Sequence, residues 1–202
     1  LESYATAMSG IARLEDRKVV RAEVDAPELA RDLAGQARAY VSARAPELAV
    51  DADAARLPEG MRLLVDRSLV EEVLDNLLSN ACGHAGERIE VSLALEDAPA
   101  APGADPAGDA AAPAPDGCRH DGSGMGEGSR RLLALRVSDD GPGFTPEALR
   151  RGCEPFFGEA KSAEHFGLGL NIVQTLARLH GGAVELANAD GRGAVVTVRF
   201  EV

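Results

Sequence analysis

DRSLVEEVLDNLLSNACGHA, residues 66–85, is the stretch that decides the fold of this chain. Its apolar residues recur every three to four positions, which is the spacing of one broad apolar face on an α-helix. Asp66 stands where an N-cap belongs, because its carboxylate can accept a hydrogen bond from a free N–H of the first turn. We therefore predict a helix over 66–85 that packs this face against a core.

Glu72, Asn76 and Asn80 follow at intervals of four residues and form one polar stripe on the predicted helix. Asn is a mediocre helix former, so two of them need an explanation. In one interpretation both are exposed or satisfy a nearby backbone group. In the other they form a hard-cation site, where an amide oxygen completes an Mg²⁺ octahedron built from phosphate oxygens and water. The helix alone leaves both interpretations open.

The composition limits the class of protein. A length of 202 residues suits one domain of ordinary size, and 45 % hydrophobic but only 3 % aromatic residues predict an aliphatic core. The net charge of −12 argues against a nucleic-acid-binding surface. Three scattered cysteines indicate free thiols in a reducing compartment. Leu1 already lies in a helical pattern, so we expect the chain to be a fragment.

The rest of the chain mixes helical and strand patterns. Asp25 is a predicted N-cap with Pro27 in the first turn, and Gly181 is a predicted C-cap. Residues 1–14 have a 3-4 spacing that suits a coiled-coil seam or a helix packed on its own domain. Strands are predicted over 19–24, 48–51, 61–65, 88–95 and 132–137, helices over 27–44, 145–151 and 167–179, and a final hairpin over 183–187 and 194–202.

The tract from 97 to 130 is rich in Ala, Pro, Gly and Asp and almost lacks large apolar residues. It cannot bury enough surface to offset the entropy of ordering it. We predict a disordered insertion at a hairpin tip. A linker between two domains is disfavoured, because neither half has enough elements for a core of its own.

Three motifs in the second half point to a ligand. DDGPGF (139–144) ends a predicted strand, and its two glycines let the backbone approach a ligand closely, although a plain turn has the same composition. Residues 153–166 are irregular and suit a mobile segment anchored by two Phe. GLGL (167–170) opens a helix, where free N–H groups and the helix dipole favour an anion.

In order, the chain contains NLLSNA (76–81), DDGPGF (139–144), EPFF (154–157), GLGL (167–170) and LHGG (179–182). The set resembles the N box, first glycine box, F box and second glycine box of the catalytic ATP-binding domain of two-component sensor histidine kinases, whose superfamily includes gyrase, Hsp90 and MutL. The resemblance covers residues 18–202. It implies an α/β sandwich of the Bergerat type: a mixed, mostly antiparallel sheet with helices on one face and an ATP lid over 144–166. It also implies that residues 1–17 end a dimerisation and phosphoacceptor helix.

The resemblance assigns roles to individual residues. Asn80 matches the Asn that holds Mg²⁺ against the phosphates of ATP, Asn76 matches a second Asn near them, and Asp139 matches the Asp that accepts a hydrogen bond from the adenine amino group. The other matches are Gly141 and Gly143 in the adenine pocket, Lys161 as a basic residue toward the phosphates, Gly167, Leu168, Gly169 and Leu170 at the end of the lid, and Phe156 and Phe157 as lid anchors. His84 departs from the family pattern and would partly replace a missing cation toward the phosphates.

The implied function is histidine protein kinase activity with ATP and Mg²⁺. The γ-phosphoryl group would pass to a histidine on the dimerisation domain of a homodimer and then to a response regulator, with this domain in the cytoplasm and the full-length protein anchored in the bacterial inner membrane. Asn76 replaces the Glu that activates water in ATP-hydrolysing relatives, so hydrolysis should be slow. No histidine of the chain has the context of the acceptor, so we predict no phosphorylation in cis.

Five positions depart from the family pattern. Gly83 and His84 stand where Lys and an aromatic residue are common, Glu164 and His165 stand where the second glycine box often begins with Gly-Gly, and Ala194 replaces a Ser or Thr. These departures suit an alternative function, a degenerate nucleotide-sensing or scaffold module with weak ATP binding. A third possibility is an anti-sigma-factor-type serine kinase, against which Asn76 and the dimerisation-helix remnant count.

Overall fold

The computed structural model describes residues 17–53, 57–97, 131–157 and 167–202. The predicted helices and strands in these ranges are confirmed with small shifts at their ends, and the predictions for 1–16, 98–130 and 158–166 lie outside them. No described helix is both long and apolar enough to cross a membrane. The elements are β1 (Ala22–Asp25), α2 (Ala26–Arg44), β2 (Ala49–Asp53), β3 (Arg62–Val65), α3 (Arg67–His84), β4 (Arg88–Asp97), β5 (Arg131–Asp139), α4 (Pro146–Arg151), α5 (Gly169–Leu179), β6 (Ala183–Asn188) and β7 (Ala194–Glu201).

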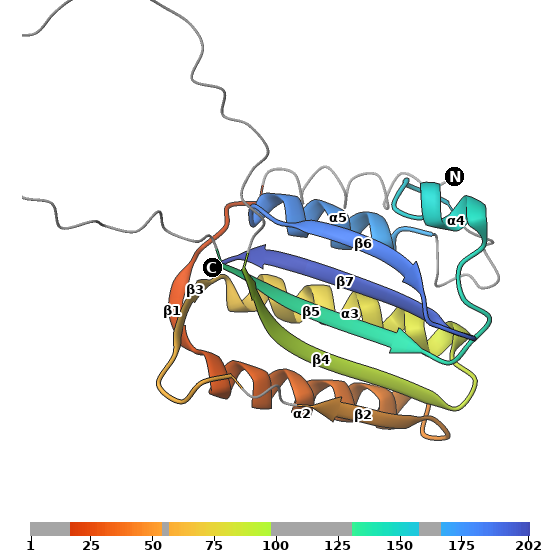
Figure 1. Ribbon diagram of the computed structural model, residues 1–202, viewed down its shortest axis with the longest axis horizontal. Helices are drawn as coiled ribbons and strands as arrows, with labels where there is room; N and C mark the ends of the chain where they lie inside the picture. The colour runs from red at the N-terminus through yellow and green to blue at the C-terminus, as the bar shows by residue number, and fades with distance from the viewer. Residues whose placement is uncertain (1–16, 54–56, 98–130, 158–166) are drawn as a thin grey trace, which may run out of the picture.

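Five strands form one mixed sheet in the order β2-β4-β5-β7-β6 (Figure 1). β2 runs parallel to β4 and the other neighbours are antiparallel, which confirms the predicted mixed, mostly antiparallel sheet. In the β4–β5 hairpin, Ile89 lies opposite Asp139 at one end and Asp97 lies opposite Arg131 at the other. β1 and β3 pair in a separate two-stranded sheet, which strand patterns alone do not predict.

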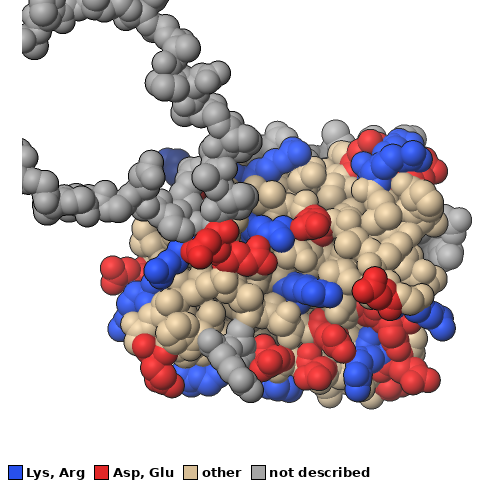
Figure 2. Space-filling model, in the orientation of Figure 1, with Lys and Arg blue, Asp and Glu red and all other residues tan. Residues whose placement is uncertain are grey.

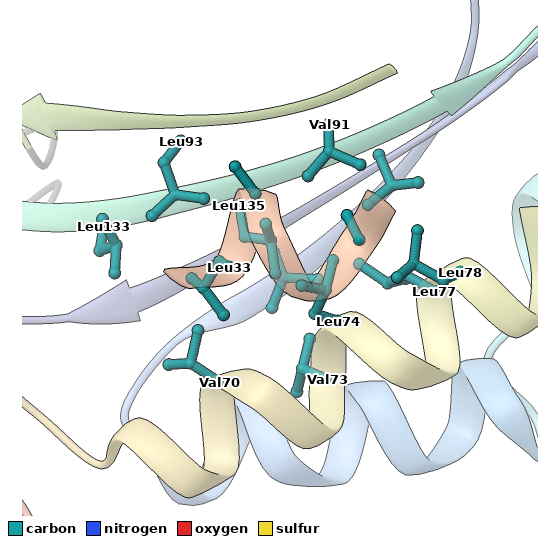
Figure 3. Packing of buried hydrophobic residues seen from close by; sticks show 14 of the residues in the cluster. Leu33, Val70, Val73, Leu74, Leu77, Leu78, Val91, Leu93, Leu133 and Leu135 are labelled. Atoms are coloured by element: carbon teal, nitrogen blue, oxygen red, sulfur yellow. The ribbon is translucent and has the colours of Figure 1, made fainter. Parts of the chain in front are cut away.

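Helices α2, α3 and α5 cover one face of the five-stranded sheet (Figure 1). The space between them is filled by buried aliphatic side chains, many of them from α3 (Figure 3). Full burial of one such side chain stabilises the fold by about 1.5–3 kcal/mol. Alternate residues of the central strands supply the sheet side of this core: Ile89, Val91 and Leu93 of β4, Leu133, Leu135 and Val137 of β5, and Val196, Val198 and Phe200 of β7.

The opposite face of the sheet carries acidic and basic side chains on an uncharged background (Figure 2). Arg199 of β7 donates to Glu96 of β4 at 2.6 Å and to Glu185 of β6 at 2.8 Å. Ala134 of β5 lies in register beside Arg199 and is only 3 % exposed. The small side chain of Ala134 leaves room for Arg199 to reach across β5 to Glu96. Ion pairs between strands thus cover part of this face, whereas helices cover the other face.

Asp66 caps α3 as predicted and also holds the chain that enters the domain. Its Oδ1 accepts a hydrogen bond from the N–H of Leu69 at 3.1 Å, and its Oδ2 accepts one from the N–H of Val20 at 2.9 Å. Burial works to raise the pKa of Asp66, but hydrogen bonds, led by that from Val20, outweigh it and lower the pKa. Arg17 pairs with Glu72 on α3. The domain boundary at residues 17 and 18 stays a prediction.

A buried histidine joins the end of α5 to the start of α3. His180 is 0 % exposed, and its Nε2 accepts a hydrogen bond from the N–H of Asp66 at 3.0 Å. Its ring meets Phe200 edge-on, with 5.6 Å between the ring centroids. Burial lowers the pKa of His180, and the charge of Arg21 lowers it further. The ring is therefore neutral in the folded domain at pH 7.

We expect His180 to make the domain less stable in mild acid. The unfolded ring takes up a proton at about pH 6.5, whereas the folded ring resists protonation until a lower pH. Its stabilising contribution is therefore complete above the unfolded pKa and is lost as the pH falls toward the folded pKa. Denaturant unfolding of wild type and His180→Gln at about pH 8, 7, 6 and 5 tests this. The wild type should lose more unfolding free energy below about pH 6.5 than the variant does, and parallel pH profiles would contradict the prediction.

Candidate nucleotide-binding site

Helix α3 and the first turn of α5 form one side of the candidate site. A Cβ added to Gly169 would lie 3.9 Å from the backbone oxygen of Asn76, so α5 begins directly beside the polar stripe of α3. That Cβ would be in ordinary van der Waals contact with Asn76. The structure therefore brings together the NLLSNA and GLGL motifs, which are far apart in the sequence.

Asn76 is satisfied on one side only. Its Nδ2 donates to the backbone oxygen of Glu72 at 2.8 Å, one turn earlier in α3, so the backbone interpretation accounts for its NH₂ group. Its Oδ1 faces the start of α5, 4.0 Å from the Cβ position of Gly169. No described group donates to this oxygen. It is thus available to a ligand held between the two helices.

Asn80 lies one turn further along α3 and is half-buried. Its side chain has no hydrogen-bond partner in the described ranges. In those ranges no three His, Cys, Asp or Glu side chains gather closely enough to hold a metal by themselves. Amide oxygens beside open helix N–H groups fit Mg²⁺, provided that phosphate and water complete its shell. The residues present therefore suit a metal that arrives with a phosphorylated ligand.

Asp139 ends β5 and presents one carboxylate oxygen to the site. Its Oδ1 accepts hydrogen bonds from the N–H of Gly141 at 2.8 Å and of Ala194 at 3.3 Å. Its Oδ2 accepts none from the described part of the chain. The two backbone donors fix the carboxylate, and the free oxygen can accept a hydrogen bond from a ligand such as the adenine amino group.

Gly141 connects the strand end to the end of α3. It is buried, and a Cβ added there would overlap the carbonyl oxygen of His84 and lie 2.8 Å from Oδ1 of Asp139. Glycine is therefore required by the space available. The contact also places the backbone of His84 beside the first glycine loop. Its side chain is exposed, and its predicted role toward the phosphates stays a prediction.

Asp140 is a structural residue that the sequence did not single out. Its Oδ1 accepts hydrogen bonds from the N–H groups of Gly86, Glu87 and Arg88, at 2.8–3.1 Å. These bonds, led by those from Glu87 and Arg88, lower the pKa of Asp140 to about 2. The side chain thereby ties the glycine loop to the turn after α3. A second Asp after a strand is the only local signal for it.

Helix α5 begins without a side-chain cap, because its N-cap is Leu168. Its first N–H groups therefore remain open to an anion. Gly167 has φ +67°, and a Cβ there would lie 2.7 Å from the carbonyl oxygen of Phe157, so only glycine suits this turn. Leu170 packs partly buried against the core. Lys161, Glu164 and His165 belong to the predicted lid and lie outside the described ranges.

The EPFF segment is tied to α5 and α4. Asn171 of α5 donates from Nδ2 to the carbonyl oxygen of Cys153 at 3.0 Å. The guanidinium of Arg151 lies 5.3 Å from the ring centroid of Phe157, within cation–π range. Phe156 has φ +62°, which is uncommon for a residue other than glycine. The buried Asn171, an amide on an otherwise apolar helix face, was the available signal for this link.

The family model described as histidine kinase-, DNA gyrase B-, and HSP90-like ATPase matches residues 65–202. This chain belongs to that family. The match contains α3, the glycine loop and α5, so it includes every residue assigned to the candidate site. The resemblance to the ATP-binding domain of sensor histidine kinases is thereby confirmed, whereas the role of each site residue stays a prediction.

The relatives of this ATPase-family chain are sensor kinases. Signal transduction histidine-protein kinase AfsQ2 of Streptomyces coelicolor is 31 % identical over 172 residues, which cover 84 % of this chain and 25 % of the relative. Sensor protein QseC of Escherichia coli K12 is 52 % identical over 58 residues, 28 % of this chain and 13 % of QseC. The chain thus spans a quarter or less of the length of these relatives.

Solved structures share the fold of this family member. Full-length ShkA in complex with AMPPNP matches with a TM-score of 0.63 and 24 % identity, over 96 % of this chain and 34 % of ShkA. The mycobacterial sensor histidine kinase MprB matches with a TM-score of 0.57 and 19 % identity, over 90 % of this chain and 97 % of MprB. The predicted α/β sandwich of the Bergerat type is confirmed.

Proposed function

We propose that this domain binds Mg²⁺-ATP and donates the γ-phosphoryl group to a histidine of an upstream dimerisation domain, for relay to a response regulator. One arrangement supports the proposal. On α3, the amide side chains of Asn76 and Asn80 form a polar stripe, and the start of α5 lies beside it. The C-terminal end of α3 packs against the loop that follows Asp139. Helix α3 would thus position both the groups that bind the phosphates and the loop that binds the base.

Each described residue would have one task in nucleotide binding. Oδ2 of Asp139 accepts a hydrogen bond from the adenine amino group, and Gly141 lets the loop pack closely enough on the end of α3 to hold Oδ1 of Asp139. The open N–H groups of α5 and the amide of Asn76 hold the phosphates. Asn80 would ligate Mg²⁺, which neutralises phosphate charge when it is bound.

Transfer would follow from positioning alone. A ring nitrogen of the neutral acceptor histidine attacks the γ-phosphorus, and the bond from that phosphorus to the β-phosphate oxygen breaks. ADP leaves with the electron pair, and the imidazole releases its proton to water. Asn76 cannot accept a proton from water as a carboxylate would, so the bound ATP is kept for the histidine. Orientation and charge neutralisation are then the whole contribution of the domain.

The partners and location belong to the same proposal. This chain matches 25 % of the length of AfsQ2. We place the acceptor histidine, the dimer interface and the membrane anchor in the part of a longer chain that corresponds to the rest of such a relative. The phosphoryl group would then pass to a response regulator in the cytoplasm. The names of AfsQ2, a signal transduction histidine-protein kinase, and of QseC, a sensor protein, support a kinase that acts in signalling.

Asp139→Asn is expected to weaken ATP binding about ten- to a hundredfold, because a charge-assisted hydrogen bond contributes about 1.5–3 kcal/mol. The amide can still accept from Gly141, but its NH₂ group would then face the adenine amino group, donor against donor. Calorimetric titration of AMPPNP with Mg²⁺ measures the loss. Asp51→Asn, with the same charge change at an exposed residue of the edge strand β2, is the matched control and should bind as wild type does.

The alternative function, a degenerate nucleotide-sensing or scaffold module, makes the opposite prediction for the wild type. Gly83 stands where a Lys is common and supplies no cation, and the His84 side chain is exposed. If the folded wild type binds no AMPPNP at millimolar concentration, these departures have disabled the site and the alternative is correct. Binding that Asp139→Asn does not weaken would mean that the nucleotide lies elsewhere.

A further inference from the structure

Residues 188–193, which are the last residue of β6 and the turn that leads to β7, make hydrogen bonds to the glycine loop of the candidate site. We call this segment the β6–β7 turn. Oδ1 of Asn188 accepts a hydrogen bond from the N–H of Phe144 at 2.7 Å, and its Nδ2 donates to the carbonyl oxygen of Phe144 at 2.9 Å. One amide side chain therefore satisfies both backbone groups of one loop residue, as a neighbouring strand would. This fixes the end of the DDGPGF motif.

The same turn also touches the start of the motif. Nε of Arg192 donates to the carbonyl oxygen of Gly141 at 3.2 Å. Gly193 has φ +118°, and a Cβ there would overlap the carbonyl oxygen of Asp139. The N–H of Ala194 reaches Oδ1 of Asp139 at 3.3 Å. The turn thus contacts the loop before, within and after its two glycines.

Gly143 shows how closely the turn and the loop fit. It has φ +79°, and a Cβ there would lie only 2.9 Å from Oδ1 of Asn188. Glycine is needed at this position because the Asn188 amide occupies the space beside it. The turn is itself closed by a hydrogen bond from the N–H of Ala189 to the carbonyl oxygen of Gly193 at 3.0 Å. It can therefore act as a preformed template for the loop.

We propose that Asn188 is a positioning residue for the adenine base, with Arg192 as its second support. The inference rests on the proposed function and adds to it a residue outside the five motifs. Asn188 holds the loop in the conformation in which Asp139 and Gly141 face the base. Without it the ligand must order the loop when it binds, and that ordering reduces affinity.

The test compares Asn188→Ala, Asn188→Asp and Asp51→Ala, an exposed position on the edge strand β2, by titration of ATP, with Mg²⁺ and with EDTA. Loss of two hydrogen bonds in Asn188→Ala should raise the dissociation constant about tenfold. Asn188→Asp keeps the acceptor for the N–H of Phe144 and loses the donor, so its affinity should be intermediate. The ratio of the two dissociation constants, with and without Mg²⁺, should stay unchanged, because the metal lies at the other end of the nucleotide. Asp51→Ala should match the wild type.

Two further readings separate a positioning role from a general structural one. Amide exchange of Phe144 in the free protein should accelerate in Asn188→Ala, while the thermal midpoint stays within a few degrees of the wild type. Wild-type affinity in Asn188→Ala would overturn this inference alone. A fall in thermal midpoint that parallels the loss of affinity and of Mg²⁺ dependence would also overturn it. A folded wild type that binds no ATP would overturn the proposed function and this inference together.

Discussion

Asn80→Ala is expected to abolish the dependence of ATP binding on Mg²⁺. The proposed site offers the metal one protein oxygen, that of Asn80, since the Asn76 amide is turned toward the start of α5. Removing that ligand should raise the dissociation constant of Mg²⁺-ATP about a hundredfold, a loss of about 2.7 kcal/mol. Calorimetry with Mg²⁺ and with EDTA should then give the same weak affinity in the variant, close to the metal-free affinity of the wild type.

Two controls make the Asn80 result specific. The Asn80 side chain has no hydrogen-bond partner in the described ranges, so its loss should change the unfolding free energy by less than about 0.5–1 kcal/mol. Asn80→Asp keeps an oxygen that Mg²⁺ can use and should retain metal-dependent binding. Undiminished Mg²⁺ dependence in the alanine variant would show that the metal is held by other groups.

Gly141→Ala should damage stability and nucleotide binding together. The added Cβ would overlap the carbonyl oxygen of His84 and lie 2.8 Å from Oδ1 of Asp139. Backbone atoms cannot move away as a flexible side chain can, so the end of α3 and the glycine loop must separate. We expect a loss of about 1–3 kcal/mol in unfolding free energy by denaturant titration. ATP affinity should fall as well, since Asp139 loses its position.

Gly83→Ala is the matched control for Gly141→Ala. Gly83 lies at the end of α3, the helix end that Gly141 packs against, and a Cβ added at Gly83 meets no atom within 4 Å. Alanine is the better helix former, so stability should stay equal or rise by up to about 1 kcal/mol. If both substitutions reduce stability equally, the close packing at Gly141 is not the cause.

The fold was predictable wherever its causes are local. The apolar period of residues 66–85 predicts α3, and the caps Asp25 and Asp66 predict where two helices begin; each accepts the expected hydrogen bond from the N–H three residues later. The separate pairing of β1 with β3 was not predictable in this way. It brings Ala22 opposite Val65, and strand period alone does not choose a partner.

The candidate site divides along the same line. Asn76, Asn80 and Asp139 lie in motifs that the family resemblance identifies. The structure brings α3, which carries both Asn residues, together with the loop that follows Asp139. Asp140 and Asn188 were missed, because each acts through the backbone of a segment remote in the sequence. A single Asp or Asn beside a turn also suits an ordinary turn, so only the three-dimensional arrangement reveals its contact.

The register of the β4–β5 hairpin has a practical consequence for engineering. Because Asp97 pairs with Arg131, the chain departs from the sheet and rejoins it at neighbouring points. The sheet therefore imposes no particular length on whatever joins them. These points lie a full strand away from Asp139, roughly 27 Å at the usual rise per residue. A reporter protein or an affinity tag spliced between Asp97 and Arg131 would hence be attached at the end of β5 remote from the proposed nucleotide site.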